Sequence, residues 1–486
     1  MIFLLHLENY NQIMIGRKNE RKTLDEARES SQSELIAVYG RRRIGKTYLV
    51  RTHFANELTF SMSGLFDATL QEHLREFATC LKNALKSTVS VKIPSDWFEA
   101  FELLKMLIET DATTSKKIIF FDEVPWLATV KSRFLTAFEA FWNGWASARK
   151  DIVVIICGSA AAWMIQKVEK SKGGLYNRVT KRIVLKPFTL AETEAFFASK
   201  SLTLSRFHTV ELYMMLGGVP HYLNQIQKGE TPAIAIDRIV FDRDGILSEE
   251  FEHLFVSLFG EGGLHKQIVE LLAQHRYGLT RDEILATFKI VSSGWFSNIL
   301  DELEASGFIV AQVSFSKNTK NAYYKAIDNY CLFYVNFKRN KKIQNWATLQ
   351  NTQQWKTWSG LTFENVCFYH KTQITKKIGI SGIQTTISSW QHKGNDEMAG
   401  SQIDMLIDRG DKAINVCEIK FNENPYIITK SYAQTLRLKM AAFNYFTKNR
   451  KTLFFTIITA GGLVQNTEAQ SLLQANIDLD DLFDNT

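Results

Sequence analysis

Residues 34–53 read ELIAVYGRRRIGKTYLVRTH and contain the strongest structural signal in the chain. Its first part, ELIAVYG (34–40), is a short apolar run, which predicts a buried β-strand. The letters GRRRIGKT (40–47) match the pattern GxxxxGK[ST], and the helix-like segment YLVRTHFA (48–55) follows at once. A strand, a glycine-rich turn and a helix in this order predict a loop whose backbone N–H groups surround phosphate oxygens.

The residue types in this loop predict a site for ATP and Mg²⁺. The glycines let the backbone curl, and the following helix offers its positive N-terminus to the same anion. Lys46 is expected to reach the β- and γ-phosphates as part of the catalytic machinery, and Thr47 to ligate Mg²⁺. The predicted nucleotide-binding residues of the loop are Gly40, Arg41, Arg42, Arg43, Ile44, Gly45, Lys46, Thr47 and Tyr48. A glycine turn that fits the pattern by chance is the alternative.

A second apolar run, IIFFDE (118–123), ends in two carboxylates. Ligands of open α/β sheets bind at the C-terminal edge of the strands, where these two side chains emerge. We expect Asp122 to hold Mg²⁺ and Glu123 to polarise the attacking water. An acidic cap on an ordinary buried strand is the alternative interpretation.

Strand-like runs alternate with helical stretches up to residue 188. The alternation predicts an α/β fold with a parallel sheet covered by helices on both faces. Residues 189 to about 245 are expected to be helical and to form a lid. The runs are ELIAVYG, KKIIFFDE (116–123), DIVVIICGS (151–159) and IVLKPF (183–188).

Three polar residues near the later strands are further candidates for catalysis. Ser159 is expected to sense the γ-phosphate and the attacking water, with a helix N-cap as the alternative role. Either Arg178 or Arg182 is a candidate arginine finger, and a surface charge or a salt-bridge partner is the alternative for each.

The segment from about 263 to 328 predicts a winged helix. Three helical patterns, the second with Thr280 as its N-cap, precede an alternating hairpin at 308–328. The third pattern, SSGWFSNILDELEASG (292–307), carries three acidic residues and neither Lys nor Arg, so it is a poor reader of DNA. It is expected to pack or to bind a partner instead. Phosphate contacts are expected from Lys317, Lys320 and Lys325, and from the run FKRNKK (337–342).

The chain from 331 to 450 is basic, with 17 Lys and Arg against 8 Asp and Glu, whereas the whole chain has a net charge of +7. This excess predicts DNA or RNA as a partner. Five cysteines are scattered without a CxxC pair, which argues against a disulfide framework or a zinc site and fits a reducing cytoplasm. No run of 18 apolar residues occurs, so no membrane span and no membrane partner is expected.

The succession of motifs resembles a known family. IGR (15–17), AVYGRRRIGKTYLV, IIFFDEVPWL, IICGSAAAWM, IVLKPFTLAE and MMLGGVPHYL follow one another in order. Over about residues 14–330 this resembles the archaeal-type P-loop ATPases, which are related to the AAA+ and STAND ATPases. The resemblance implies that Ile15, Gly16 and Arg17 lie near the adenine, and that Pro220 packs by the base. From the residues alone, the sequence around Pro220 would be only a helix break.

Members of that family often carry a C-terminal domain that resembles PD-(D/E)xK restriction endonucleases. Glu418 and Lys420 are two apart in a strand-like run and therefore share a face. Asp404 joins that face if a hairpin loop at 409–411 pairs 408 with 412 and 404 with 416. Glu364 matches the acidic helix residue of the family. Asp404, Glu418 and Glu364 would then hold Mg²⁺, and Lys420 would orient the water.

These observations predict three domains: an ATPase core with a helical lid (14–250), a winged helix (260–330) and a nuclease-like α/β domain (331–470). The expected function is an ATPase whose nucleotide state controls the nuclease-like domain, with nucleic-acid cleavage as a second activity. One alternative is a STAND-like switch that forms homo-oligomers on ATP and acts through protein partners. The other is a DNA-binding ATPase with an inactive nuclease fold.

Overall fold

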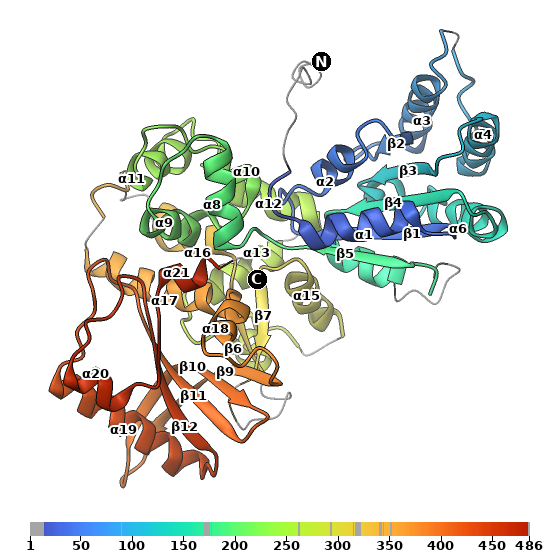
Figure 1. The fold of residues 1–486 in the computed structure, drawn as a ribbon. Helices are drawn as coiled ribbons and strands as arrows, with labels where there is room; N and C mark the ends of the chain where they lie inside the picture. The colour runs from blue at the N-terminus through green and yellow to red at the C-terminus, as the bar shows by residue number, and fades with distance from the viewer. Residues whose placement is uncertain are drawn as a thin grey trace. The chain divides into compact units, whose positions relative to one another are not determined.

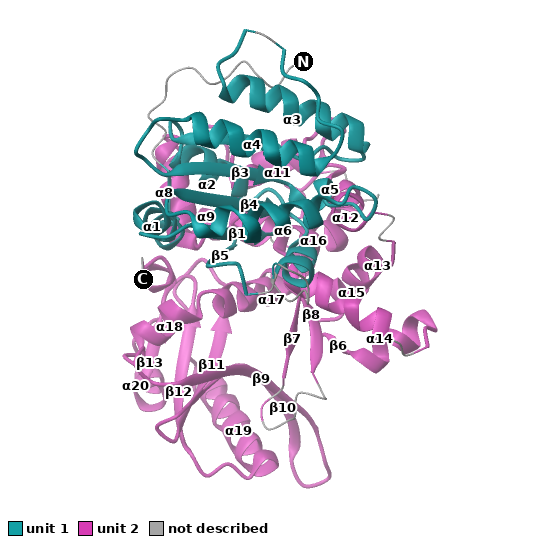
Figure 2. Ribbon diagram, turned by 90° about the vertical axis from the view of Figure 1, so that its right-hand side faces the viewer, with its two compact units in different colours: residues 1–187 teal, residues 188–486 magenta. Residues whose placement is uncertain are grey.

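The computed structural model describes residues 14–484 apart from 89, 170–174, 176, 261–262, 292–293, 314, 316–321, 340–342, 344 and 350–351. The chain divides into two compact units, Met1–Pro187 and Phe188–Thr486 (Figure 2). The helices predicted to form a lid over 189–245 belong to the second unit. The three-domain division at 14–250, 260–330 and 331–470 remains a proposal.

The first unit contains a five-stranded parallel sheet in the order β2-β3-β4-β1-β5 (Figure 1). This confirms the predicted α/β fold with a parallel sheet. The strands are β1 (Glu34–Gly40), β2 (Leu58–Ser63), β3 (Lys117–Asp122), β4 (Ile152–Gly158) and β5 (Lys181–Leu185). The helices are α1 (Lys18–Glu29), α2 (Lys46–His53), α3 (Leu70–Ala84), α4 (Trp97–Thr110), α5 (Val124–Leu127), α6 (Phe134–Gly144) and α7 (Ala161–Met164).

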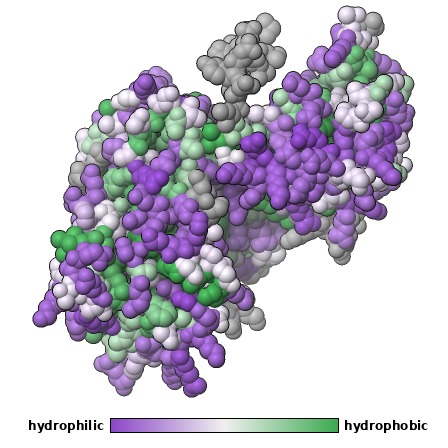
Figure 3. Space-filling view, in the orientation of Figure 1, coloured by the Kyte–Doolittle hydropathy of each residue, from purple (hydrophilic) through white to green (hydrophobic). Residues whose placement is uncertain are grey.

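Both faces of this sheet are covered. Every residue of β3 and of β4 is buried, so neither strand alternates between polar and apolar positions. On one face α1 packs through Leu24 and Ala27, and its opposite side is charged and forms part of the hydrophilic surface seen in Figure 3. On the other face, α4 and α6 contribute an aromatic cluster, in which Phe101 of α4 contacts Phe121 of β3 at 5.8 Å between ring centroids.

The second unit begins with helices that bury a long apolar cluster. These helices are α8 (Leu190–Ser199), α9 (Arg206–Leu216), α10 (Pro220–Leu223), α11 (Pro232–Ile236) and α12 (Glu250–Phe259). The break between α9 and α10 requires glycine, because a Cβ on Gly218 would lie 2.0 Å from the carbonyl oxygen of Phe188. The helical character predicted for 189–245 is therefore confirmed.

The next elements follow the order predicted for a winged helix. They are α13 (Gly263–Ala273), β6 (Leu279–Thr280), α14 (Arg281–Phe288), α15 (Gly294–Ala305), β7 (Ile309–Gln312) and β8 (Tyr323–Ala326), with β6-β8-β7 as a small antiparallel sheet. Thr280 is the N-cap of α14, as the sequence predicted, and it also forms a capping box with Glu283. Lys317, Lys320 and residues 340–342 lie outside the described residues.

The last part of the chain forms a second five-stranded sheet, in the order β13-β12-β11-β10-β9. Its strands are β9 (Thr385–Gly394), β10 (Ala399–Arg409), β11 (Ala413–Lys420), β12 (Thr452–Thr459) and β13 (Ala475–Ile477). The strands β9, β10 and β11 pair antiparallel, whereas β11, β12 and β13 pair parallel. The helices are α16 (Asn329–Phe333), α17 (Gln353–Tyr369), α18 (Lys371–Lys377), α19 (Lys430–Thr447), α20 (Thr467–Leu472) and α21 (Leu479–Leu482).

The register predicted for the β10–β11 hairpin is wrong by two residues. Asp408 pairs with Ile414 rather than with Lys412. The reason is that Lys412 adopts a left-handed conformation, with φ of 65°, and closes a turn that lies one residue later than predicted. Because side chains alternate with a period of two, a shift of two residues leaves the face of each side chain unchanged.

The described part of the chain contains no helix that is both long and apolar enough to cross a membrane. None of the five cysteines, all of which are described, takes part in a disulfide.

Candidate nucleotide site and a second acidic cluster

The loop between β1 and α2 has the shape that its glycines permit. Gly40 ends β1 with φ of 147°, and a Cβ there would lie 2.2 Å from the carbonyl oxygen of Leu185 on the neighbouring strand β5. A side chain at this position would therefore displace β5 or the loop. Gly45 directly precedes α2, so the loop leads straight into a helix N-terminus, as the sequence predicted.

Lys46 lies inside the loop. Its ammonium group donates hydrogen bonds to the carbonyl oxygens of Gly40 at 3.1 Å and of Arg41 at 2.9 Å. Burial lowers the pKa of Lys46, although the nearby carboxylates of Glu123 and Asp122 act in the opposite direction. A positive charge is thus enclosed by the segment that was predicted to hold phosphate.

Thr47 and Asp122 meet at the C-terminal edge of the sheet. Thr47 Oγ1 donates to Asp122 Oδ2 at 2.7 Å, and Ser63 Oγ, at the end of β2, lies 3.4 Å from the same oxygen. The other carboxylate oxygen of Asp122 accepts the backbone N–H of Glu123 at 3.1 Å. A hydroxyl and a carboxylate are hard oxygen donors that suit Mg²⁺, which usually takes few protein ligands and keeps several waters. The residues present therefore fit Mg²⁺.

Glu123 follows Asp122 in a left-handed conformation, with φ of 47°, which turns the chain sharply out of β3. Its carboxylate accepts the hydroxyl of Ser159 and, at 3.0 Å, the backbone N–H of the same residue. The N-cap of α7 is Ala160, so Ser159 does not have the alternative role of a side-chain cap. Ser159 instead holds the carboxylate that was predicted to act on water.

Arg17 joins three segments near the loop. Its guanidinium donates to the carbonyl oxygen of Ile44, in the loop, at 3.2 Å, and to that of Lys186, just after β5, at 2.7 Å. The side chain is buried and precedes α1. The structure thus brings Arg17, and with it Ile15 and Gly16, to the side of the phosphate-binding loop, while their contact with adenine remains a prediction.

The remaining predicted residues of this site are less closely tied to it. Tyr48 is 45% exposed on α2. Arg178 lies on an exposed turn and Arg182 on an outward-facing position of β5, so the choice between them as arginine finger stays open. Pro220 begins α10 in the second unit, and its predicted place beside the base remains a prediction.

A parallel sheet, a phosphate-binding loop after its first strand and an acidic pair after a neighbouring strand define a P-loop ATPase. Residues 14–226 match the family model described as "ATPase domain predominantly from Archaea". This part of the chain is therefore similar to ATPase domains of the archaeal type.

The proteins similar to this chain include three from archaea. The chain is 25% identical over 418 residues to the uncharacterized protein MJECL04 of Methanocaldococcus jannaschii. The matched stretch covers 85% of this chain and 88% of that protein. Among solved structures, the Walker-type ATPase PABY2304 of Pyrococcus abyssi is similar with a TM-score of 0.49 and 18% identity, over 69% of this chain and 99% of that one. The ORC2 protein of Aeropyrum pernix follows with a TM-score of 0.43 and 14% identity, over 68% of this chain and 95% of that one.

A second group of charged side chains lies on β10 and β11 of the C-terminal sheet. Glu418 is 3% exposed, and its carboxylate accepts Lys420 Nζ at 2.8 Å, Tyr432 Oη at 2.7 Å and Lys439 Nζ at 2.7 Å. Burial raises the pKa of Glu418, but the two lysines outweigh it and leave this pKa below its ordinary value. Glu418 and Lys420 share a face of the strand, as predicted.

Asp404 lies beside this group, at a bulge in β10. The register against β9 shifts between Ile403 and Leu406, so that one extra residue of β10 is accommodated there. Asp404 Oδ2 accepts the backbone N–H of Ile419 at 3.0 Å. Burial and the charge of Glu418 raise the pKa of Asp404. The structure thus brings Asp404 and Glu418 together, as the sequence predicted.

Glu364, on α17, lines a small pocket with Asp404. Its Oε1 accepts a hydrogen bond from Arg276 at 3.1 Å, and Lys325 of β8 lines the same pocket. Burial and the negative charge of Asp404 raise the pKa of Glu364 to about 7. Two cations from the segment 263–328 therefore face the acids of the C-terminal sheet.

The donor set of this second group is less suited to a divalent cation than the first. Glu418 already accepts three hydrogen bonds, two of them from lysine ammonium groups, so a divalent cation there would lie beside two positive charges. Within the described ranges, no group of three or more His, Cys, Asp and Glu side chains could hold a metal ion. The predicted ligand set Asp404, Glu418 and Glu364 therefore does not fit a metal ion in the arrangement described.

Several residues of these groups were missed by sequence reasoning. Ser63 belongs to a strand that was not predicted, and a serine that ends a strand beside a buried carboxylate is the only signal that could have found it. Tyr432 and Lys439 lie in the first and third turns of α19, seven residues apart, where the helical period would have placed them on one face. Arg276 precedes the predicted wing, and no local pattern connects it to Glu364.

Proposed function

We propose that the first unit binds ATP with Mg²⁺ at residues 40–47 and hydrolyses it. The observation that carries this proposal is the 2.7 Å hydrogen bond between Thr47 and Asp122, with Glu123 as the next residue. This hydrogen bond joins Thr47, the residue after the P-loop lysine, to the acidic pair at the same edge of the sheet. A bound Mg²⁺ would offset the negative charge of the phosphates during the reaction.

The residues of the chain have distinct roles in this proposal. Lys46 exchanges the two loop carbonyls for phosphate oxygens and stabilises the charge that develops on them. Glu123 orients a water molecule and accepts its proton, for which it must turn away from the hydroxyl of Ser159. Ser159 is thus a positioning residue, which either holds Glu123 or releases it.

Two measurements on the full-length chain test this proposal. Calorimetric titration with ATP and Mg²⁺ is expected to give saturable heat, and phosphate release is expected to follow at a rate that depends on the acidic pair. If the titration gives no heat, the nucleotide site is refuted. Heat without phosphate release, even when Ser159 is replaced by Ala, would leave a binding site and refute hydrolysis.

We further propose that the nucleotide state of this ATPase controls a C-terminal domain that acts on DNA or RNA. The basic excess between 331 and 450 supports a nucleic-acid partner. The meeting of Asp404, Glu418 and Lys420 on two paired strands supports a nuclease-like domain. The lysines that occupy Glu418 and the absence of a metal-binding acid group among the described residues favour the alternative of an inactive nuclease fold that binds without cutting.

A cleavage assay separates these possibilities. Plasmid and single-stranded DNA are incubated with the full-length chain and Mg²⁺, with and without ATP. Cleavage that is lost in Lys420→Ala but retained in Lys46→Ala would establish a nuclease independent of ATP. Binding without cleavage would establish the inactive fold. Absence of both, together with a sedimentation mass that grows on addition of ATP, would establish the STAND-like switch.

A further inference from the structure

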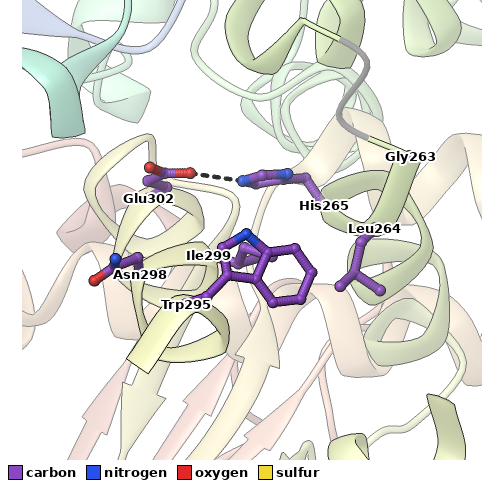
Figure 4. Close-up of a pocket in the computed structure, with 7 residues that line it drawn as sticks. All are labelled: Gly263, Leu264, His265, Trp295, Asn298, Ile299 and Glu302. Carbon is purple, nitrogen blue, oxygen red and sulfur yellow. Dashed lines mark hydrogen bonds and ion pairs between the residues drawn. The ribbon is translucent and has the colours of Figure 1, made fainter. Parts of the chain in front are cut away.

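The helices α13 and α15 enclose a pocket of about 320 Å³ that none of the motifs above explains (Figure 4). This volume is at the lower end for ligand pockets, so it accommodates one long side chain rather than a whole helix. Leu264 and Ile299 form its apolar floor, and the indole of Trp295 stands over them as one wall. Asn298 and Glu302, one and two turns further along α15 from Trp295, provide its polar groups.

Trp295 is 58% exposed, although tryptophan is one of the most extensively buried residue types in folded proteins. Its ring face is thus available to a partner at the start of α15. Exposed tryptophans with a polar rim are typical of the centres of binding sites.

Glu302 is held in place at the opposite end of the pocket. Its Oε2 lies 2.7 Å from His265 Nε2, and the ring of His265 stacks on Phe259 with 4.1 Å between centroids. In the part of the chain that the structure describes, Oε1 of Glu302 has no hydrogen-bond partner. A carboxylate that is fixed by one oxygen and accessible through the other is ready to bind a cation.

The charge of α15 decides the nature of the occupant. The helix carries Asp301, Glu302 and Glu304 and has neither Lys nor Arg, so it repels phosphate. Lys266, on the adjacent helix α13, is paired with Glu252 at 2.6 Å and does not neutralise this face. A cation on a protein partner is therefore favoured over nucleic acid.

We propose that this pocket binds an arginine side chain presented by a protein partner. A planar guanidinium can stack on the indole of Trp295 while it donates to Glu302 and to the amide oxygen of Asn298. A lysine ammonium can donate to the same two oxygens, but it has no planar group that stacks on the indole while it does so. The predicted winged helix is then a protein-recognition element, and its acidic third helix, α15, provides the carboxylate that binds the arginine.

The test uses the full-length chain labelled with 5-fluorotryptophan, in which the signal of Trp295 is assigned by its loss in Trp295→Phe. N-acetylarginine amide is the probe, and N-acetylcitrulline amide, which has nearly the same shape without the charge, is the control. The arginine probe is expected to shift the Trp295 signal saturably, with an affinity several-fold higher than that of the citrulline probe. Glu302→Gln is expected to weaken arginine binding several-fold.

Asp301→Asn is the matched control, because it removes a neighbouring charge of the same helix that does not line the pocket. It is expected to leave arginine binding within twofold of wild type, and thermal unfolding verifies that each variant is folded. Equal binding of both probes, an unmoved Trp295 signal, or an unchanged affinity in Glu302→Gln would overturn the proposal. A duplex oligonucleotide that shifts the signal more strongly than arginine would also overturn it, as would a sedimentation mass that falls in Trp295→Ala, which would indicate a second copy of the chain.

Discussion

Thr47 and Asp122 are 75 residues apart in the chain, yet their side chains form a hydrogen bond of 2.7 Å. Thr47 lies in the first turn of α2, and Asp122 is the last residue of β3. Their meeting requires that β1 and β3 end at the same edge of the sheet, which the parallel order β3-β4-β1 ensures. The phosphate-binding loop and the acidic pair therefore form a single site.

The role of Glu123 as the base is tested by Glu123→Gln, which keeps the size of the side chain but cannot accept a proton from water. We expect ATP binding to be retained and phosphate release to fall by roughly 10²–10⁴-fold, the usual contribution of a general base. Glu26→Gln is the matched control, since Glu26 is an exposed carboxylate that pairs with Lys181. Unchanged phosphate release in Glu123→Gln would mean that another group activates the water.

The two hydroxyls beside Asp122 are expected to differ in importance. Thr47→Ala removes the closer one and should weaken Mg²⁺-dependent ATP binding by about 10–100-fold, since hydrogen bonds to charged groups contribute about 1.5–3 kcal/mol. Ser63→Ala removes the hydroxyl that lies 3.4 Å from Asp122 and should weaken Mg²⁺-dependent ATP binding by less than about threefold. Calorimetry at several Mg²⁺ concentrations measures both. An equal loss in the two variants would contradict the assignment of Thr47 as the metal-facing hydroxyl.

The lysines around Glu418 predict a structural role for this carboxylate, whether or not the domain cleaves nucleic acid. Glu418→Gln leaves the ammonium groups of Lys420 and Lys439 without their counter-charge, and we expect a loss of about 2–4 kcal/mol in the free energy of unfolding. Urea denaturation measures this loss. Glu468→Gln, which breaks only a partly exposed pair with Arg437, should cost less than about 1 kcal/mol. A Glu418→Gln variant as stable as wild type would show that the lysines do not depend on it.

Glu211 on α9 gives the second unit a predictable pH dependence. Burial and the charge of Glu423 raise its pKa from 4.5 to about 7. The folded state therefore holds this proton more tightly than the unfolded state, and stability is expected to fall as the pH rises from about 4.5 to about 7. Glu211→Gln should remove this part of the slope, and Glu423→Gln should reduce it, as followed by urea denaturation across that range. A slope that is the same in wild type and Glu211→Gln would contradict the shift.

The nucleotide site was accessible from sequence because its signals are local. The strand 34–40 was predicted with the same bounds as β1. An apolar run that ends at a glycine leaves little choice about where the strand ends. The strand β2 was missed because it lies at the sheet edge, where polar and apolar residues alternate and give only a weak run in LTFSMS. The hydroxyl of Ser63 was missed with it.

Contacts between distant segments were less accessible. The bulge at Asp404 and the left-handed turn at Lys412 are backbone choices that the packing of the sheet imposes, and neither has a proline or glycine at the residue itself to indicate it. The pairing of Arg276 with Glu364 depends on how the segment 263–328 packs in the second unit, which periodicity does not encode. Local chemistry was therefore predictable, whereas the partners that tune it were not.

Arg17 connects the phosphate-binding loop to the C-terminal end of the first unit through two hydrogen bonds. Its guanidinium holds Ile44 with one nitrogen and Lys186 with another, and Lys186 is followed by Pro187, the last residue of that unit. A movement of the loop that displaces the Ile44 carbonyl would therefore disturb a side chain that also contacts residue 186. Arg17 thus links the backbone of the loop to the backbone at the C-terminal end of the first unit.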